Sequence, residues 1–311
     1  MILCCGEALI DMIPSQTELN DPGYVPHVGG SVYNTAIALG RLGIPVSMIT
    51  GLSRDLFGQQ LIAGLRESGV DTSMILMSDR PTTLAFVQLD GGQASYTFYD
   101  ENSAGRCLGA SDMPAVPVST TALFFGGISL CSEPGADAYL ALAEKAAPKH
   151  AIMLDPNVRP GFVRDEASYR ARLNRMITLA DIIKVSSEDL EWIFPGPETT
   201  NEKISNLLDM GPAFVVLTQG GEGAVVFAHD GSHIVVPAVE AVVADTVAAG
   251  DTFNAALLAW LDMHGGLNKS TIGSLPIDTL QAALDFAAKA AAITVSRTGA
   301  NPPWKRELEQ A

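Results

Sequence analysis

The chain has 311 residues, of which 47% are hydrophobic and 17% charged, and its formal net charge is −16. This length accommodates one large domain or two ordinary ones, and the composition is typical of a globular protein rather than a disordered one. The acidity excludes nucleic acid as an expected partner, because phosphate binding depends on clustered Lys and Arg side chains, which this sequence lacks.

The N-terminal segment MILCCGEALID is predicted to be a strand rather than a targeting sequence. It has no basic leader, and Glu7 and Asp11 interrupt it too early for a signal peptide. No apolar run approaches the roughly 18 residues of a membrane span, so no membrane partner is expected. The four cysteines have neither metal-ligand nor disulfide-scaffold spacing, which favours reduced thiols in a cytoplasmic protein.

Short apolar runs alternate with helical patterns along most of the chain. Strands separated by helices in this way predict a parallel sheet covered by helices on both faces, so the fold class is α/β. The strand-like runs are 2–5, 45–50, 122–127, 151–155, 181–186 and 213–219, and the helical patterns are 31–43, 55–69, 135–147, 165–180, 251–264 and 276–296.

The stretch TTLAFVQLDGGQASYTFYD at 82–100 departs from this alternation. Two alternating strands around the turn Asp90-Gly91-Gly92 predict a β-hairpin. Two interpretations are equally open: a lid that projects from the α/β body, or an edge hairpin of the main sheet. Because there is no internal repeat or obvious linker, we expect one domain, 1–311, rather than two equal ones.

The segment DTVAAGDTFNAALLAWL at 245–261 predicts a helix that begins at about Gly250–Asp251. Its apolar positions recur at helical spacing and mark one buried face. The small residues at 248–250 let backbone N–H groups approach a ligand closely, and the free donors and dipole of a helix N-terminus attract anions. The peptide is therefore suited to hold a phosphate. The apolar positions are Phe253, Ala256, Leu257, Trp260 and Leu261.

Asp251 stands beside this anion site, where a carboxylate without a function would repel the anion. One interpretation is a helix N-cap, for which Asp is among the best residues. The other is a general base that accepts a proton from a hydroxyl as its oxygen attacks a phosphoryl group. In the second case, we expect the positive end of the helix to keep Asp251 ionised at neutral pH.

Two motifs resemble the signatures of the ribokinase-like, PfkB-type carbohydrate kinases, in particular the fructokinase type. DTVAAGDTFN at 245–254 is similar to their C-terminal signature, and VGGSVYNTAIALG at 28–40 to their N-terminal one, about 215 residues earlier. The resemblance covers essentially the whole chain. It implies a three-layer α/β/α domain with a mainly parallel central sheet and a small β lid from about 12–28 and 82–107.

The resemblance also implies roles for residues near each motif. Asp251 is the expected catalytic base, and the amides of Ala248, Ala249 and Gly250 form the expected anion hole for the γ-phosphoryl group of ATP.

The N-terminal motif is suited to bind a sugar. Gly29 and Gly30 allow close backbone approach at a turn, and the Asn34 amide, in the first turn of the following helix, can donate to and accept from vicinal hydroxyls. Asp11, expected at the end of the first strand, offers an acceptor for two hydroxyls. The resemblance places all four in the sugar pocket; without it, the glycines would indicate only a turn.

DPNVRPG at 155–161 follows a predicted strand, and ligands bind at the carboxyl ends of strands in open α/β sheets. It resembles an Asp-x-Asn-x-Arg segment of the fructokinase-type members, which implies that Arg159 steadies substrate or phosphate charge. The alternative is a surface arginine in a proline-rich turn.

For the nucleotide, the resemblance implies Thr218, Gly220 and Gly223 of LTQGGEG around ATP, with the adenine pocket completed near Gly299 to Asn301.

KVSSEDL at 184–190 is similar to the family's Asn-x-x-Glu segment, which organises Mg²⁺ through water. Ser186 stands where Asn is common and Asp189 where Glu is common, so Glu188 shares the expected metal role and Ser186 is placed with the ATP site. The resemblance also leaves room for a monovalent cation, K⁺, around Asp245, Val247 and the loop at 296–300. Asp245 would equally cap a turn.

Other phosphate-handling classes lack their motifs here. There is no Gly-Lys pair and hence no Walker A loop, and no G-x-G-x-x-G follows the first strand, which disfavours an NAD-dependent dehydrogenase. A catalytically inactive sugar-binding protein is the non-enzyme alternative. Retention of Asp251 argues against it, because a pure binder gains nothing from a carboxylate beside a phosphate site.

The predicted substrate is a neutral sugar whose primary hydroxyl is phosphorylated, first D-fructose, then ribose, and third the sugar acid of 2-keto-3-deoxygluconate kinases. The last group tends to place an arginine near position 100, where this chain has Asp100. A carboxylate there would repel a sugar acid by about 1 kcal/mol in water at 4 Å, unless Asp100 points to solvent. Lids of this family often pair between subunits, which makes a homodimer through the lid the expected assembly.

Overall fold

Eight strands of the computed structural model, which describes residues 1–90 and 93–310, form one central sheet in the order β14-β13-β12-β11-β10-β9-β1-β4. Neighbours from β12 to β4 pair in parallel, whereas β13 and β14 are antiparallel and form one edge. The mainly parallel sheet is confirmed. Its strands are β1 (Ile2–Cys5), β4 (Val46–Ile49), β9 (Ala122–Gly126), β10 (Ala151–Asp155), β11 (Ile182–Ser186), β12 (Phe214–Thr218), β13 (Ala224–Ala228) and β14 (His233–Val236).

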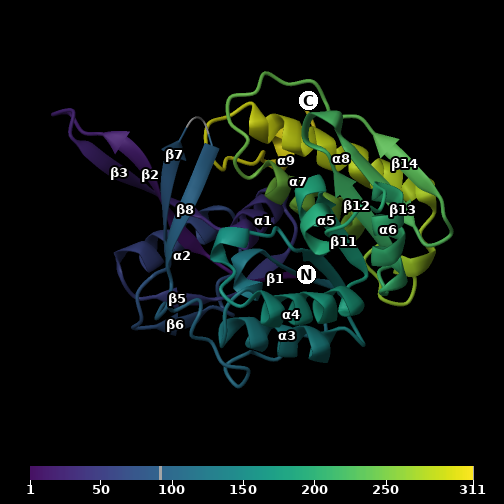
Figure 1. Cartoon of the computed structure of the whole chain (residues 1–311), viewed down its shortest axis with the longest axis horizontal. Coiled ribbons are helices and arrows are strands. Elements are labelled where there is room, and N and C mark those ends of the chain that lie inside the picture. The colour runs from purple at the N-terminus through teal and green to yellow at the C-terminus, as the bar shows by residue number, and fades with distance from the viewer. Residues whose placement is uncertain (91–92, 311) are drawn as a thin grey trace.

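Helices cover both faces of this sheet, which is the predicted three-layer α/β/α arrangement (Figure 1). Side chains alternate along a strand, so Ile2 and Cys4 of β1 join one core while Leu3 and Cys5 join the other. The first face carries α1 (Ser31–Arg41), α2 (Leu56–Glu67), α7 (Ala249–Met263), α8 (Ile277–Val295) and α9 (Lys305–Leu308), and the second α3 (Gly135–Ala146), α4 (Glu166–Leu179), α5 (Ser187–Ile193) and α6 (Thr200–Asp209).

A second sheet, of order β3-β2-β7-β8, projects from one side of this body (Figure 1). The predicted hairpin is confirmed as β7 and β8, although its Gly91-Gly92 turn lies outside the described residues. Its interpretation as an edge hairpin of the main sheet is wrong, because β7 pairs with β2 instead. The strands are β2 (Leu9–Gln16), β3 (Pro22–Gly29), β7 (Leu84–Asp90) and β8 (Gln93–Tyr99); β5 (Gly51–Ser53) and β6 (Leu76–Ser78) form a small separate pair.

The N-terminal segment forms two strands, not the single one predicted. The chain leaves the main sheet after Cys5 and enters the second sheet at Leu9. At Gly6, between them, a Cβ atom would lie 2.6 Å from Val32 Cγ2 of α1, so only a glycine fits this close crossing. Asp11 consequently lies on β2 of the second sheet, rather than at the end of the first strand as predicted.

Helix α7 begins at Ala249, close to the predicted start, with Ala248 at the N-cap position in a left-handed conformation (φ 60°). The predicted apolar face is packed, but most of the remaining surface is buried as well. The reason is that α7 packs against α1 and α8 in addition to the sheet; Thr294 Oγ1 of α8 donates to Thr252 Oγ1 at 3.0 Å.

In the described part of the chain, none of the helices is both long and apolar enough to cross a bilayer. The four cysteines are free thiols, and burial raises the pKa of Cys4 far above its ordinary value. This agrees with the prediction of reduced cysteines.

Candidate active site

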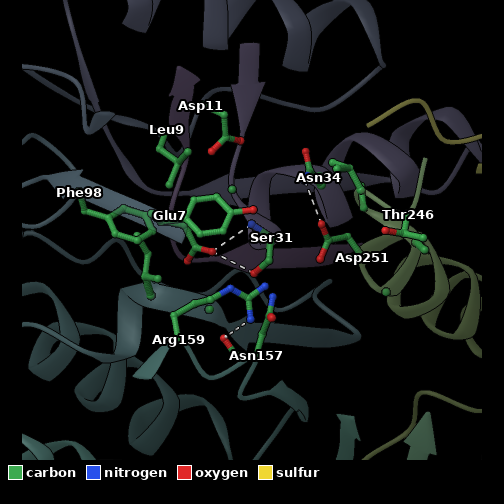
Figure 2. A pocket seen from close by; sticks show the side chains of 18 of the residues that line it. Glu7, Leu9, Asp11, Ser31, Asn34, Phe98, Asn157, Arg159, Thr246 and Asp251 are labelled. Atoms are coloured by element: carbon green, nitrogen blue, oxygen red, sulfur yellow. Dashed lines mark hydrogen bonds between the residues drawn. The ribbon is translucent and has the colours of Figure 1, made fainter. Parts of the chain in front are cut away.

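A cavity of about 360 Å³ opens over the carboxyl ends of β9, β10 and β11, between the second sheet and the first turn of α7 (Figure 2). Polar side chains from both bodies of the fold converge on it, and Leu9, Tyr96, Phe98 and Ile128 supply apolar surface. The polar side chains are Glu7, Asp11, Ser31, Asn34, Asn157, Arg159, Lys184, Thr246 and Asp251.

A second cavity of about 480 Å³ lies on the other side of the α7 N-terminus and is mostly apolar. Thr246, Ala249 and Gly250 line both cavities. The two spaces therefore meet at the start of α7, where the predicted phosphate-binding peptide lies.

Asp251 lines the first cavity and accepts a hydrogen bond from Asn34 Nδ2 of α1 at 2.9 Å (Figure 2). Ala248 occupies the N-cap position of α7, so the interpretation of Asp251 as the N-cap is wrong. The carboxylate is only 8% exposed, and burial raises its pKa to about 7, with the charge of Asp155 adding to the effect. The expectation that the helix end keeps it fully ionised is thus corrected: desolvation outweighs the Asn34 hydrogen bond and the nearby charge of Lys184.

The first turn of α7 presents free backbone donors. Its first intrahelical bond runs from the Thr252 N–H to the Ala248 carbonyl at 2.9 Å, so the N–H groups of Gly250 and Asp251 have no acceptor within the helix. The Ala249 N–H donates to the Thr246 carbonyl at 3.3 Å and is already partly engaged. Among the predicted anion-hole amides, those of Ala248 and Gly250 are more available than that of Ala249.

The glycine pair of the N-terminal motif lies against two acidic residues, Gly29 against Asp11 and Gly30 against Glu7. A Cβ atom at Gly29 would lie 2.1 Å from Asp11 Oδ2, so the absence of a side chain makes room for this carboxylate. Gly30 is the N-cap of α1 and has φ 105°, which favours glycine. Burial raises the pKa of Asp11 to about 6. These residues and Asn34 are brought together as predicted.

Arg159 enters the cavity from the side opposite Asp11 (Figure 2). Its guanidinium is exposed and donates to the carbonyls of Val158 at 3.1 Å and Asn157 at 3.4 Å. Arg159 therefore is not simply a surface arginine of a proline-rich turn, because its side chain lines the cavity.

Asp100 does not line this cavity. It is buried and paired with Arg106 Nη1 at 3.4 Å in a separate small cavity, and burial raises its pKa despite that partner. The solvent-facing alternative is wrong, because the side chain is buried. Since Asp100 also lies outside the first cavity, the argument for a neutral sugar does not rest on this position.

Sequence reasoning missed five polar residues of the cavity as site residues: Glu7, Ser31, Asn157, Lys184 and Thr246. Glu7 Oε1 accepts from the Ser31 N–H at 3.0 Å and from its Oγ at 2.9 Å, which fixes the start of α1 (Figure 2). The available signal for Glu7 was a charged residue separated from a fully apolar strand only by Gly6. For Lys184 it was a single lysine within the apolar strand IIKVS.

The second cavity contains three of the predicted ATP-site residues, Thr218, Gly220 and Gly223. The other two do not line it. Ser186 caps α5, where its Oγ accepts from the Asp189 N–H at 3.0 Å, and Asn301 Oδ1 accepts from Arg41 Nη1 at 2.8 Å.

The two predicted magnesium residues, Asp189 and Glu188, differ in whether their carboxylates are available to bind a metal ion. Asp189 is buried, and its two oxygens accept from the N–H groups of Val158 (2.8 Å) and Ser186 (3.3 Å), so it does not fit a magnesium ligand. Glu188 is exposed and lines neither of these two cavities. No cluster of three or more His, Cys, Asp or Glu side chains suited to a metal occurs in residues 1–90 and 93–310.

Asp245 caps a turn, as its alternative interpretation predicted. Its Oδ1 accepts from the Val247 N–H at 3.0 Å, and its Oδ2 accepts from the Gly299 N–H at 2.9 Å. The second bond brings the loop at 296–300 beside the Asp245 turn, which is the proximity that the predicted monovalent-cation site requires.

The family model for pfkB family carbohydrate kinases matches residues 1–307. The chain is 45% identical to a fructokinase of Rhizobium leguminosarum bv. trifolii over 282 residues, which covers 90% of this chain and 86% of the relative. It superposes on the crystal structure of a fructokinase with bound ATP from Xylella fastidiosa with a TM-score of 0.89 and 27% identity, covering 99% and 98% of the two chains. The fructokinase from Vibrio cholerae O395 with fructose, ADP and calcium ion bound gives 0.86 at 25% identity, covering 99% and 97%.

Proposed function

The chain belongs to the pfkB family of carbohydrate kinases, and on that premise we propose that it transfers the γ-phosphoryl group of ATP to the primary hydroxyl of D-fructose, giving fructose 6-phosphate. The observation that carries this proposal is the meeting of two cavities at the start of α7, with Asp251 in one of them. The sugar occupies the cavity lined by Asp11 and Asn34, and ATP the one lined by Thr218.

In the reaction, the sugar hydroxyl attacks the phosphorus atom in line with the leaving ADP oxygen. Asp251 accepts the hydroxyl proton, while the free amides of the first turn of α7 stabilise the charge on the phosphoryl oxygens. Asp11 and Asn34 hold other hydroxyls of the sugar, and Arg159 steadies negative charge from the opposite wall. Exclusion of water from the cavity limits the competing hydrolysis of ATP.

A neutral sugar fits the charges of the first cavity better than a sugar acid. Glu7, Asp11 and Asp251 line it, and each would repel a substrate carboxylate. The two cations of the cavity offset this only in part, because Lys184 is paired with Asp155 and Arg159 is exposed to solvent. The names of the relatives favour fructose among neutral sugars. Ribose and 2-keto-3-deoxygluconate remain the alternative substrates.

We propose that Mg²⁺ arrives with the nucleotide, because Mg²⁺ at such sites is usually held by substrate phosphates and waters with one or two carboxylates. Of the two predicted metal residues of α5, Asp189 is engaged with backbone donors. Glu188 is exposed and lines neither cavity, so we propose that it reaches the ion only through water. A monovalent cation between the Asp245 turn and the loop at 296–300 is a further proposal; a related Vibrio cholerae O395 fructokinase variant has been solved with fructose, ADP and potassium ion bound.

An ADP-release assay with a panel of sugars tests the function. We expect turnover with fructose to exceed that with ribose and with 2-keto-3-deoxygluconate, and replacement of K⁺ by tetramethylammonium to lower the rate. Preferred turnover of the acid would contradict the substrate assignment. Sugar binding in calorimetry with no ADP release from any sugar would support the inactive binding protein instead.

The second sheet is proposed to act as a lid and as a dimer interface. An aromatic cluster of Tyr24, Phe86 and Tyr99 lies on the face opposite the cavity-lining Asp11 and Phe98, with ring centroids 5.0 and 5.5 Å apart. Tyr24 is 44% and Tyr99 58% exposed, which is much apolar surface for an unpaired sheet face.

Light scattering after gel filtration is expected to show a dimer for the wild type and a monomer for Tyr99→Glu, because a charge at the centre of an apolar interface is desolvated without a partner. Val118→Glu is the matched control, since Val118 is 98% exposed and lies outside the second sheet. A wild-type monomer at micromolar concentration would overturn this assembly.

The acid limb of the pH profile follows from the two raised pKa values in the first cavity. Asp251 (pKa about 7) must be ionised to accept a proton, and Asp11 (about 6) to accept hydroxyl hydrogen bonds, so kcat/KM rises with pH and levels off above 7. With both substrates below KM, we expect roughly 20-fold lower kcat/KM at pH 6 than at pH 9. Asp11→Asn removes one ionisation and should leave a slope of one below pH 6. A flat profile from pH 5.5 to 8 would contradict the assignment.

A further inference from the structure

A lysine lies inside the central sheet next to the anion-binding peptide. Lys184 of β11 is only 6% exposed, and its ammonium donates to Asp155 Oδ2, at the end of β10, at 2.8 Å. Asn254 Nδ2 of α7 donates to the same oxygen at 2.7 Å. The carboxylate therefore joins two neighbouring strands to the helix that carries Asp251.

Such a buried pair needs a reason beyond stability. Taking two charges out of water costs several kcal/mol per ion, and apolar residues of similar volume often serve stability as well or better. Asp155 is 1% exposed and Asn254 fully buried, and one oxygen of each has no hydrogen-bond partner within the described residues. The desolvation of this polar cluster is unfavourable for folding, and apolar side chains could fill the same position.

The ammonium faces the reaction space. Lys184 lines the first cavity together with Gly250 and Asp251, and a Cβ atom at Gly250 would lie 3.3 Å from Lys184 Nζ. Gly250 lines both cavities, so the amine lies beside the passage through which a phosphoryl group must move.

We propose that Lys184 is a catalytic residue that binds the transferring phosphoryl group, and that Asp155 and Asn254 position its ammonium. This inference rests on the proposed kinase function. The sugar oxygen forms a bond to phosphorus as the bond from phosphorus to the ADP oxygen breaks, and the hydroxyl proton goes to Asp251. Lys184 keeps its own protons and neutralises charge on the non-bridging oxygens, for which an ammonium with one donor held by Asp155 has two donors left.

The charge of Lys184 is retained in this environment. Burial alone would lower the pKa of its ammonium, but the carboxylates of Asp155 and Asp189 outweigh that effect and raise the pKa. The group is therefore a permanent cation over the range of pH in which Asp251 titrates.

The test compares Lys184→Met with the double variant Lys184→Met/Asp155→Asn. The double variant removes the charges of both Lys184 and Asp155, so it leaves no unpaired buried carboxylate that would destabilise the fold. It therefore tests the effect on phosphate binding separately from an effect on folding. We expect kcat to fall by about 10²- to 10³-fold in the double variant, as on removal of one oxyanion donor. Calorimetry should show at least about 10-fold weaker binding of the β,γ-imido analogue of ATP, with ADP binding unchanged.

Lys203→Met is the matched control. Lys203 is another buried lysine, 1% exposed and paired with Glu191 Oε2 at 2.6 Å, but it lines neither of the two cavities. Its loss should lower thermal stability without separating analogue from ADP binding.

Two results would overturn the inference: a double variant with kcat within about threefold of the wild type, or one that weakens ADP and analogue binding equally. If the wild type phosphorylates no sugar of the panel, the proposed function fails, yet the difference between analogue and ADP binding still decides whether Lys184 contacts the terminal phosphate.

Discussion

Replacement of Asp251 by asparagine is expected to lower kcat for sugar phosphorylation by about 10²- to 10⁴-fold, the range that a positioned general base contributes. Asparagine keeps the shape of the side chain and an oxygen that can accept from Asn34 Nδ2, which now lies 2.9 Å from the carboxylate. What it loses is the ability to accept the hydroxyl proton. Steady-state ADP release at saturating sugar and ATP measures the effect.

Thermal unfolding at pH 8 separates lost chemistry from lost structure. Burial raises the pKa of Asp251 to about 7, above the value of about 4 for an unfolded aspartate. Its favourable contribution to folding is thus present below pH 4 and is lost as the pH rises through 7. At pH 8, the wild type contains an unfavourable buried charge that Asp251→Asn lacks, so the variant should unfold at the same or a higher temperature. A variant that keeps kcat within tenfold of the wild type would remove Asp251 from the base role.

Replacement of Asp11 by alanine should raise KM for fructose about 100-fold or more and leave KM for ATP nearly unchanged. The proposed contacts are charge-assisted hydrogen bonds to two sugar hydroxyls, each worth about 1.5–3 kcal/mol. Asp11 lines the first cavity and not the second, so its loss should not disturb the nucleotide. Initial rates across fructose and ATP concentrations measure both constants.

Gly29→Ala tests the same contact without removing the acid. The added Cβ atom would lie 2.1 Å from Asp11 Oδ2, so the carboxylate must move away from its present position. We expect a rise in fructose KM of similar direction. Gly273→Ala is the control, because a Cβ atom there meets nothing within 4 Å. If Asp11→Ala left fructose KM within threefold of the wild type, Asp11 would not be a sugar ligand.

Local patterns predicted the main elements of the fold, but not the partners of every strand. The alternation of apolar strands and helices identified the parallel sheet, and the hairpin around 91–92 was visible from its alternating residues. The pairing of β2 with β7 was not, because Ile10 and Leu84 meet from distant parts of the chain. No periodicity within either strand encodes that contact, and the single strand predicted at 1–11 hid the crossing to the second sheet.

The candidate site shows a similar division. Asp251, Gly250 and Asn34 were predicted to lie at the site because they stand in local motifs, and they do line the cavity. Asp11 lies outside both motifs and was predicted from the resemblance and from a strand position that proved wrong. Motif analogy misplaced the metal role of Asp189, although the spacing Ser186-x-x-Asp189 is that of a capping box, which the structure contains. That local rule explains its carboxylate better than the analogy does.

Lys184 was overlooked for a different reason. The role inferred for Lys184 depends on its contact with Asp155, which also binds Asn254. These two residues lie 29 and 70 positions from Lys184 in the chain and meet it only in the folded protein.

The short crossing between Cys5 and Leu9 has a mechanical consequence. Asp11, Tyr96 and Phe98 ride on the second sheet, whereas Asp251, Asn34 and Lys184 belong to the three-layer body. The proposed sugar ligand Asp11 and the proposed base Asp251 thus belong to different parts of the fold. A rotation of the second sheet relative to the three-layer body would change the direction from which the sugar hydroxyl approaches the phosphorus atom. The alignment of the two reactants therefore depends on the relative orientation of the two sheets and not on a single side chain.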